Sequence, residues 1–539
     1  MVYSAGYDTC HGHLKEYFKD DDIESLYFDP IEIIKILEFS DFRWFRAPVC
    51  NFNDVRELFT MVRTNLKAFS GHYTSQLFGK EKLHSDFASR KIASSIYENM
   101  KKFPVKNFYL WSILGREKDI KTHGDESDVS TRVVMTCENP IVTLLMWFNQ
   151  KMSYILSYGD WNRTYNIAGE FNNEKFSKLL KHENYYDFIL EADWSFYDSN
   201  IDSSFLLVAG LIICSGLPDD RLHRNIRYLI ISSIITKYVV MPPGVVVELN
   251  RAQPSGHPFG TLINCNVNLI YWSIIGYKIY GKDYAKYMRV EVYGDDTRAY
   301  FKNHKNLNNL DQYVKECGLK SEILKDNFRS THEFSEKNEN IDFLKRRFDI
   351  EGVRWNHKKM FDRWLYQSKN RNIDDQILLV SSYYESVPSD NDVLTLVKLF
   401  TKFMLDEYSD KLSYDSIKFC ESYSEHNLKI NNVRNEKFFS YYNRTNHSME
   451  SFNKINDTFS YSCMIYKPEE VIDQIIVRNL NLEKVLHSLF FCAEDVLGTG
   501  RSPPYDPISD FEIKEFTKSY WNDKGIDSIN FLKRKFNLK

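Results

Sequence analysis

Two short segments of this sequence combine carboxylates with apolar flanks in a way that suits metal binding. In the first, an apolar run leads into Asp193, and Asp198 follows five residues later. In the second, Gly294-Asp295-Asp296 lies between two apolar stretches. Neighbouring carboxylates repel each other unless a cation neutralises them, and Mg²⁺ prefers oxygen ligands. The two segments therefore predict one shared site for divalent cations.

Asp193 and Asp295 are the expected bridging ligands of two Mg²⁺ ions, with Asp296 assisting. Two metals ~4 Å apart can activate an attacking 3′ hydroxyl and stabilise a leaving pyrophosphate. Asp198 would then lie beside the incoming sugar rather than on the metals. An ordinary solvated turn at the double Asp is the alternative that this pair alone leaves open.

The residues around these acids predict the elements that must position them. Apolar residues on both sides of the double Asp, within Met288–Phe301, predict two strands joined by a tight turn. Another predicted strand runs into Asp193. Between the acidic segments, Gln253–Asn264 predicts a turn that opens an apolar helix. Gly256 is expected to let this turn approach a nucleotide or template, and the helix start would offer N–H donors to phosphate. A plain structural turn is the alternative.

In chain order, these segments resemble motifs A, B and C of viral RNA-dependent RNA polymerases. The positions that carry the resemblance are Asp193, Asp198, Ser255, Gly256, Asn264, Gly294, Asp295 and Asp296. The sequence departs from the family at Gly260, where threonine is common, and this puts the role of that threonine in doubt. The resemblance implies a nucleotidyltransferase that uses two Mg²⁺ ions, for which Mn²⁺ can substitute. The nucleotide-binding residues that it implies in motifs A and B are Asp198, Ser255, Gly256 and Asn264.

Upstream segments resemble accessory motifs of the same family. Gly115–Lys118 and Thr131–Val134 resemble the two halves of motif F, whose cations line the nucleotide entry path. Ser70–Lys80 resembles motif G, which guides the template. Solvated surface charge is the alternative for the motif F cations. These cations, which the resemblance implies to bind the nucleotide, are Arg116, Lys118 and Arg132.

Downstream of the double Asp, two basic segments resemble motifs D and E. Gly318–Lys325 resembles motif D, which implies that Lys325 is the general acid that protonates the departing pyrophosphate. Lys320 is the competing position, and two surface lysines are the alternative. Phe343–Phe348 resembles the primer-grip hairpin of motif E, with a plain basic strand as the alternative. The residues implied to bind RNA there are Lys345 and Arg346.

The composition is that of a globular protein, with 43% hydrophobic and 27% charged residues, which excludes a disordered or collagen-like chain. The net charge of −4 gives no overall attraction to polyanions, so RNA would bind in a locally basic channel. The nine cysteines form no CxxC pair, which favours a reducing compartment. The apolar stretches Phe205–Cys214 and Tyr228–Val247 fall short of a membrane span and predict a buried helix and a hairpin.

The patterns predict an α+β chain, and the resemblance implies a right-hand polymerase fold with fingers, palm and thumb around a template channel. The palm would be an antiparallel sheet that carries Asp193 on one strand and the double Asp on a neighbouring hairpin. Helical patterns cover Asn309–Cys317 and Asp392–Leu405. The expected parts are an N-terminal region with fingers (1–185), palm motif A (186–205), an insertion (206–250), palm motifs B to E (251–365) and a helical thumb with the C-terminal region (366–539).

Two alternatives to an RNA polymerase stay open. Tyr293–Asp296 also fits the Tyr-x-Asp-Asp pattern of reverse transcriptases. Those enzymes usually carry an aromatic residue at the position of Asp198, and they lack the motif B helix. The second alternative is a catalytically silent RNA-binding protein that kept a polymerase fold, which the presence of all three metal acids disfavours.

A Met-initiated chain of this length resembles the stand-alone polymerase of a small double-stranded RNA virus. Partitiviruses, including their cryspovirus branch, are the nearest expected relatives, and picobirnavirus-like enzymes are second. The expected partners are RNA template and product, nucleoside triphosphates and viral capsid protein, without a membrane. The expected location is inside the virus particle within the host cytoplasm.

Overall fold

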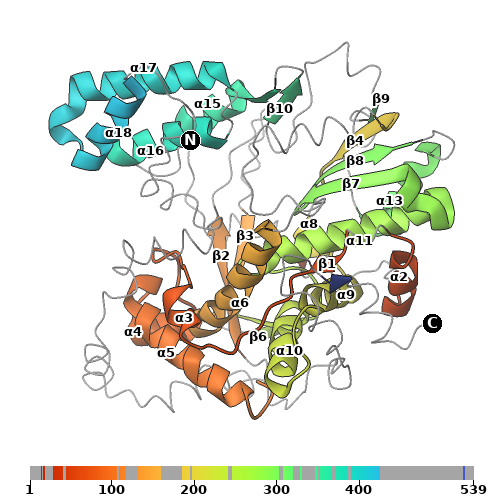
Figure 1. Cartoon of the computed structure of the whole chain (residues 1–539). Helices are drawn as coiled ribbons and strands as arrows, with labels where there is room; N and C mark the ends of the chain where they lie inside the picture. The colour runs from red at the N-terminus through yellow and green to blue at the C-terminus, as the bar shows by residue number, and fades with distance from the viewer. Residues whose placement is uncertain are drawn as a thin grey trace.

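Figure 1 shows the computed structural model of the chain, in which helices and strands are mixed, as an α+β protein requires. The residues that the structure describes are 14, 16–17, 28–40, 44–105, 109–116, 132–158, 185–194, 197–240, 246–302, 307–319, 328–330, 346–349, 352–365, 371–386, 390–424 and 526–527.

A four-stranded antiparallel sheet carries both acidic segments. Its strand order is β7-β8-β4-β9, and its strands are β4 (Phe188–Ala192), β7 (Met288–Tyr293), β8 (Asp296–Phe301) and β9 (Phe328–Ser330). β8 pairs with β7 on one side and with β4 on the other, and all of these pairs are antiparallel. The strand predicted before Asp193 and the hairpin predicted around the double Asp are both confirmed.

One face of this sheet is apolar and packs against the long helix α11 (Gly260–Tyr280) (Figure 1). Alternate strand residues such as Leu190, Val292 and Ala299 belong to the same buried core as the helix, because side chains of a strand point alternately to its two faces. α11 is buried nearly all round, since α9 (Ser203–Cys214) and α2 (Pro30–Leu37) also pack on it. The predicted buried helix at Phe205–Cys214 is confirmed as α9.

A second sheet joins residues from two distant parts of the chain. Its order is β3-β2-β5-β6, and its strands are β2 (Leu110–Arg116), β3 (Arg132–Cys137), β5 (Lys237–Val240) and β6 (Val246–Leu249). β2 pairs antiparallel with β3 and parallel with β5, and β5 pairs antiparallel with β6. The hairpin at 237–249 therefore extends the sheet that the proposed motif F strands begin.

The hairpin predicted over Tyr228–Val247 is wrong in its first part. Residues up to Ile235 belong to helix α10 (Arg221–Ile235), and the hairpin begins only at Lys237. The helix starts at Asp220, whose side chain accepts the N–H of His223, a typical N-cap. A short, mostly apolar segment is compatible with a buried helix as well as with a buried strand, which explains the error.

The remaining helices form two groups (Figure 1). Those of the N-terminal group are α3 (Glu57–Thr60), α4 (His72–Phe78), α5 (Lys82–Met100) and α6 (Asn139–Tyr158). Those after the sheets are α15 (His357–Leu365), α16 (Ile373–Ser386), α17 (Asn391–Tyr408) and α18 (Tyr414–Ser424). The later group has its own core, which includes Ile377, Val380 and Val397. The helix predicted at Asp392–Leu405 is confirmed as α17.

Short elements complete the described part of the chain. They are β1 (Arg46–Ala47), α8 (Tyr197–Asn200), η1 (Gly281–Asp283), α12 (Tyr284–Tyr287), η2 (Leu307–Asn309), α13 (Leu310–Glu316), β10 (Arg346–Asp349), β11 (Gly352–Trp355), η3 (Ser409–Lys411) and β12 (Ile526–Asp527). α13 confirms the helix predicted at Asn309–Cys317. β10 and β11 form an antiparallel hairpin that includes the end of the motif E-like segment. No helix within the described ranges is both long and apolar enough to span a membrane.

Candidate active site

The three predicted metal acids converge at one end of the first sheet. β4 and β8 run antiparallel with Ala192 opposite Thr297, so one further step along this register places Asp193 across from Asp296. Asp193 is exposed, and Asp295 and Asp296 are half-buried. The fold thus brings together acids that are far apart in the sequence.

The turn between β7 and β8 presents the double Asp. Tyr293 pairs with Asp296, so Gly294 and Asp295 form a two-residue turn. Gly294 has φ of +63°, a conformation that favours glycine and that matches the twist of hairpin strands at the first turn position. A substitution of this glycine would strain the turn.

Two side chains of α11 bond the backbone of this turn. The Gly294 N–H donates to Cys265 Sγ at 3.1 Å. The amide of Asn268 donates to the carbonyl oxygens of Gly294 at 2.8 Å and Asp295 at 3.2 Å. The sequence predictions did not include either side chain. The signal for Asn268 was present, because a polar residue inside an otherwise apolar buried helix needs a partner.

Asp198 and Asn264, the two residues predicted to read the sugar, are hydrogen-bonded to each other. Asn264 Nδ2, on α11, donates to Asp198 Oδ1, on α8, at 2.7 Å. The Oδ1 atom of Asn264 is buried and accepts no hydrogen bond from the residues that the structure describes. A backbone hydrogen bond joins the same two segments, because the Gln253 N–H donates to the Asp198 carbonyl oxygen at 2.7 Å. The pair therefore offers an unused acceptor beside a carboxylate.

The Ser255–Gly256 turn, which resembles motif B, is docked on strand β3. Ser255 Oγ donates to the Val133 carbonyl at 3.1 Å, and the Gly256 N–H donates to the Met135 carbonyl at 3.0 Å. A Cβ atom on Gly256 would lie 2.3 Å from the Met135 oxygen. The sequence predicted that this glycine permits approach to a nucleotide, but in this structure the close approach that requires it is to the backbone of β3.

Two buried polar side chains support this turn from below. Lys237 Nζ donates to four backbone carbonyls at 2.7 to 3.1 Å, those of Ile234, Ile235, Arg251 and Ala252. Burial holds the pKa of Lys237 well below its ordinary value. One of these carbonyls belongs to Ala252, whose backbone is constrained, because its φ of +65° is a left-handed conformation that residues other than glycine rarely adopt. Lys237 is thus the side chain that fixes the entry to the turn.

His257 completes this support. The Phe259 N–H donates to Nδ1 of His257 at 3.0 Å, so the neutral ring carries its proton on Nε2, which lies 2.9 Å from Ser233 Oγ. Burial, and then the charge of Lys237, lower the pKa of His257 to about 3. The ring also stacks on Trp111 of β2 at a centroid distance of 5.8 Å. The histidine therefore ties the turn to the second sheet.

Gly260, where the sequence departs from the expected threonine, is not required by space. A Cβ there would meet Gln253 Nε2 at 3.5 Å, an ordinary contact, and Gly260 does not have positive φ. The Gln253 side chain is fully buried against this position. The structure gives no steric reason for the glycine.

The predicted basic residues are described only in part. Arg116 and Arg132 lie opposite each other at the end of the β2–β3 pair, which places the two halves of the proposed motif F side by side. Arg346 begins β10 and pairs with Trp355. The side chains of these arginines lie outside the described part of the structure. Whole residues outside the described ranges are Lys118, Lys320, Lys325 and Lys345.

Residues 172–391 match the sequence model of a family described as viral RNA-dependent RNA polymerase. This region is an RNA-directed RNA polymerase domain. The matched residues include Asp193, Asp198, the Ser255 turn with Asn264, and the double Asp at 295 and 296. The polymerase match does not extend to the proposed motif F and motif G segments. A search of curated proteins found no significant match to the chain.

Polymerases of this kind generally use divalent metals, and the donor chemistry at the strand ends fits such ions. Asp193, Asp295 and Asp296 supply only carboxylate oxygens, the ligands that Mg²⁺ and Mn²⁺ prefer. The backbone register brings these residues together, and rotation of the side chains sets the distances between their oxygens. In the structure, they do not form a group whose ligand atoms all lie within 4.8 Å of one another.

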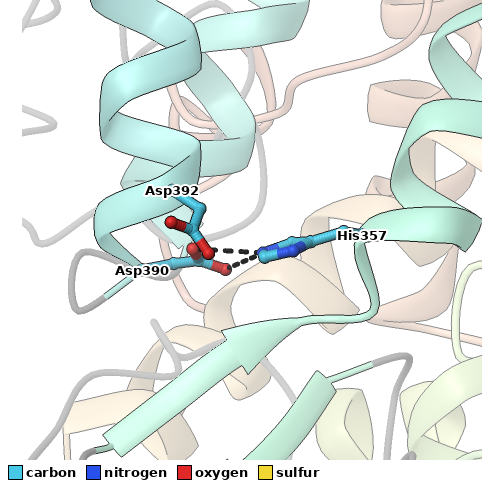
Figure 2. A group of neighbouring side chains, drawn as sticks. All are labelled: His357, Asp390 and Asp392. Atoms are coloured by element: carbon cyan, nitrogen blue, oxygen red, sulfur yellow. Dashed lines mark hydrogen bonds and ion pairs between the residues drawn. The ribbon is translucent and has the colours of Figure 1, made fainter.

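Such a group does occur elsewhere in the described part of the chain, at the C-terminal end of the polymerase match, with His357, Asp390 and Asp392 (Figure 2). Asp390 is 1% exposed, and its oxygens are already occupied. They accept the N–H groups of Trp355 at 2.8 Å and Val393 at 3.1 Å. His357 Nε2 lies 2.9 Å from Asp390 Oδ2. Asp390 therefore caps α17 and anchors β11, which is a structural task.

Proposed function

We propose that this protein transcribes and replicates a viral RNA genome, double-stranded in nature, by nucleotidyl transfer with two metal ions. The observation that carries the proposal is the pairing of β4 with β8, which puts Asp193 beside the Asp295-Asp296 turn inside the region that matches viral RNA polymerases. Asp193 and Asp295 would hold both Mg²⁺ ions, with Asp296 assisting. Bound there, the ions would supply charge for the attacking 3′ hydroxyl and the leaving pyrophosphate.

The protein's own residues would orient the nucleotide and move its proton. Asp198 and Asn264 would read the 2′ hydroxyl, which is both a donor and an acceptor. Their mutual bond at 2.7 Å and the unused Asn264 Oδ1 support this role. Lys325 would give a proton to the pyrophosphate. Arg116, Lys118 and Arg132 would guide the nucleotide.

The wider architecture belongs to the same proposal. The sheet that holds the acids would be the palm, the second sheet with the N-terminal helices would be the fingers, and the α15–α18 group would be the thumb. The position of Arg116 opposite Arg132 at the end of the β2–β3 pair supports a cationic path on the fingers. The family resemblance supports a partitivirus-like enzyme, a capsid protein partner and a location inside the virus particle.

A reverse transcriptase is the second candidate, since Tyr293–Asp296 fits its pattern as well. The Asp198–Asn264 pair disfavours a reverse transcriptase. A site that hydrogen-bonds the 2′ hydroxyl of ribose rejects deoxyribose, which lacks it. Purified protein with Mg²⁺ or Mn²⁺, unprimed single-stranded RNA and labelled NTPs in parallel with dNTPs separates the two. Incorporation of NTPs alone is expected, and incorporation of dNTPs instead would overturn the proposal.

The sugar-reading role has its own test in the same assay. Asp198→Ala and Asn264→Ala should lower the efficiency with NTPs by about tenfold or more, since a buried hydrogen bond to the 2′ hydroxyl is lost. The efficiency with dNTPs should fall less. Equal losses for both sugars would remove the pair from this role.

A further inference from the structure

Asn268 lies at the point where the two acidic segments and helix α11 meet. It is fully buried and lies one helical turn after Asn264. Its Oδ1 accepts the Nε1–H of Trp194 at 3.1 Å and the Oγ1–H of Thr297 at 3.0 Å. Its Nδ2 donates to the carbonyls of the Gly294–Asp295 turn. One side chain thus contacts the residue after Asp193 and the backbone of Asp295.

The partners of Asn268 fix which way its amide points. A carbonyl oxygen can only accept, so the NH₂ group must face the turn. An indole N–H can only donate, so the amide oxygen must face Trp194. No other side chain of this size has a donor and an acceptor in this arrangement. Asp would lose the donor, and Leu would lose both.

Neighbouring groups reinforce the same geometry. Trp272 Nε1 donates to Thr297 Oγ1 at 3.2 Å, which orients the hydroxyl that Asn268 accepts. Cys265, one turn earlier on α11, accepts the Gly294 N–H. The turn is therefore bonded to α11 at both its N–H and its carbonyl groups. The helix that also carries Asn264 is the rigid body to which both acidic segments are attached.

We propose that Asn268 is a positioning residue that sets the distance between Asp193 and Asp295. This inference rests on the proposed function, because it assigns these two acids to the metal ions. Asn268 does not reach the substrate itself. It acts by holding Trp194 on one strand end and the Asp295 backbone on the next, so that both carboxylates can approach one pair of ions.

The alternative is that Asn268 serves stability alone, as a satisfied polar group in the core. The two roles differ in what a substitution changes. A purely structural residue would alter the resistance to unfolding and leave metal binding by the folded protein intact. A positioning residue would weaken metal binding even in the folded protein, because groups that orient metal ligands typically contribute ~10- to 100-fold to metal affinity.

The test compares Asn268→Leu with Asn139→Leu in the full chain. Asn139 is a matched control, since it is also fully buried, and its amide donates to Ser85 Oγ at 3.1 Å and Ser89 Oγ at 2.9 Å. Mn²⁺ binding without nucleotide is measured by electron paramagnetic resonance, and thermal unfolding is followed by circular dichroism. Single-turnover incorporation gives the rate and the apparent nucleotide affinity separately.

We expect Asn268→Leu to weaken Mn²⁺ binding by ~10-fold and to slow incorporation at least as much. The apparent nucleotide affinity should stay within about threefold, because the Asp198–Asn264 pair is intact. Asn139→Leu should lower the unfolding temperature without a change in Mn²⁺ affinity. If both variants bind Mn²⁺ as the wild type does, the inference is overturned.

A milder variant covers the case in which Asn268→Leu does not fold. Trp194→Phe removes the indole N–H that donates to Asn268, together with part of the buried ring, and it should weaken Mn²⁺ binding by about threefold. Unchanged Mn²⁺ binding in this variant would count against the inference. A wild-type protein that binds Mn²⁺ but incorporates no nucleotide would instead refute the proposed function, so the two failures are distinguishable.

Discussion

Two groups of acidic side chains lie in different parts of the molecule, one at the ends of β4 and β8 and one at the start of α17. At the strand ends, α11 bonds the backbone of the Gly294–Asp295 turn, and Asp193 remains exposed. At the helix start, Asp390 is buried and bonds two backbone N–H groups with its own carboxylate. In the first group, side chains of α11 fix the backbone that carries the acids. In the second group, the Asp390 carboxylate itself fixes the backbone of its neighbours.

This difference separates a candidate metal site from a close group of possible ligands. The ligand atoms of His357, Asp390 and Asp392 lie within 4.8 Å of one another (Figure 2). The Asp390 oxygens nevertheless serve a helix cap and a strand. The strand-end acids are less tightly grouped, but their backbone is fixed and Asp193 faces solvent. Proximity of acids is therefore a weaker guide to metal binding than the task that each carboxylate already performs.

The largest expected difference is in nucleotide incorporation, when one acid is removed from each group in turn. Asp295→Ala should lower nucleotide incorporation by about a thousandfold or more, because it removes a ligand that balances the charge of the transition state. Asp392→Ala should stay within about twofold of the wild type, since exposed side chains away from a site contribute little. Incorporation by purified protein at saturating Mg²⁺ measures both.

The folding of the two variants supplies the control. Asp295→Ala leaves acids that repel each other less, so its stability should hold or rise slightly. Activity of Asp295→Ala within tenfold of the wild type would contradict the assignment of the strand-end acids to the metals. A large loss of activity in Asp392→Ala would show that the group at the start of α17 contributes to catalysis, contrary to the comparison.

A second substitution should act on stability. Asp390→Ala removes the N-cap of α17 and leaves the buried Trp355 N–H without its acceptor, which should cost about 3 kcal/mol in the free energy of unfolding. Asp392→Ala should change it by less than about 0.5 kcal/mol. Urea unfolding measures both. Equal stability of the two variants would refute the capping role.

The smallest expected effect concerns pH and the support of the motif B turn. The pKa of His257 falls from its ordinary 6.5 to about 3 through burial. Between these values the unfolded chain binds a proton that the folded protein does not, so this contribution is fully present above about pH 6.5 and declines as the pH falls. From about pH 7.5 to about pH 5, the loss attributable to His257 should be about 2 kcal/mol.

Urea unfolding of the wild type and of His257→Gln at both pH values isolates this contribution. The variant should lose about 2 kcal/mol less than the wild type over the same interval, since glutamine does not titrate. An identical pH dependence in the two proteins would mean that His257 is not buried as a neutral ring. Its place beneath the Ser255–Gly256 turn would then need revision.

Local sequence patterns predicted the pieces of the site well. The strand before Asp193, the hairpin around the double Asp and the helix after the Ser255 turn depend on neighbouring residues, and all three occur. The hairpin predicted at Tyr228–Val247 failed in its first part, since a short apolar run is compatible with a buried helix as well as with a buried strand. Local patterns are informative where polar and apolar residues alternate.

The sequence by itself determined the order of the acids, the turn at Gly294 and the presence of a helix after the Ser255 turn, because each depends on neighbours along the chain. Only the tertiary structure decided that Asp193 lies across from Asp296, since strand register is set by packing between distant segments. It also decided that Gly256 is needed for contact with β3 and that Asn268 joins the two acidic segments. These roles arise from hydrogen bonds between residues far apart in the chain, which no local pattern encodes.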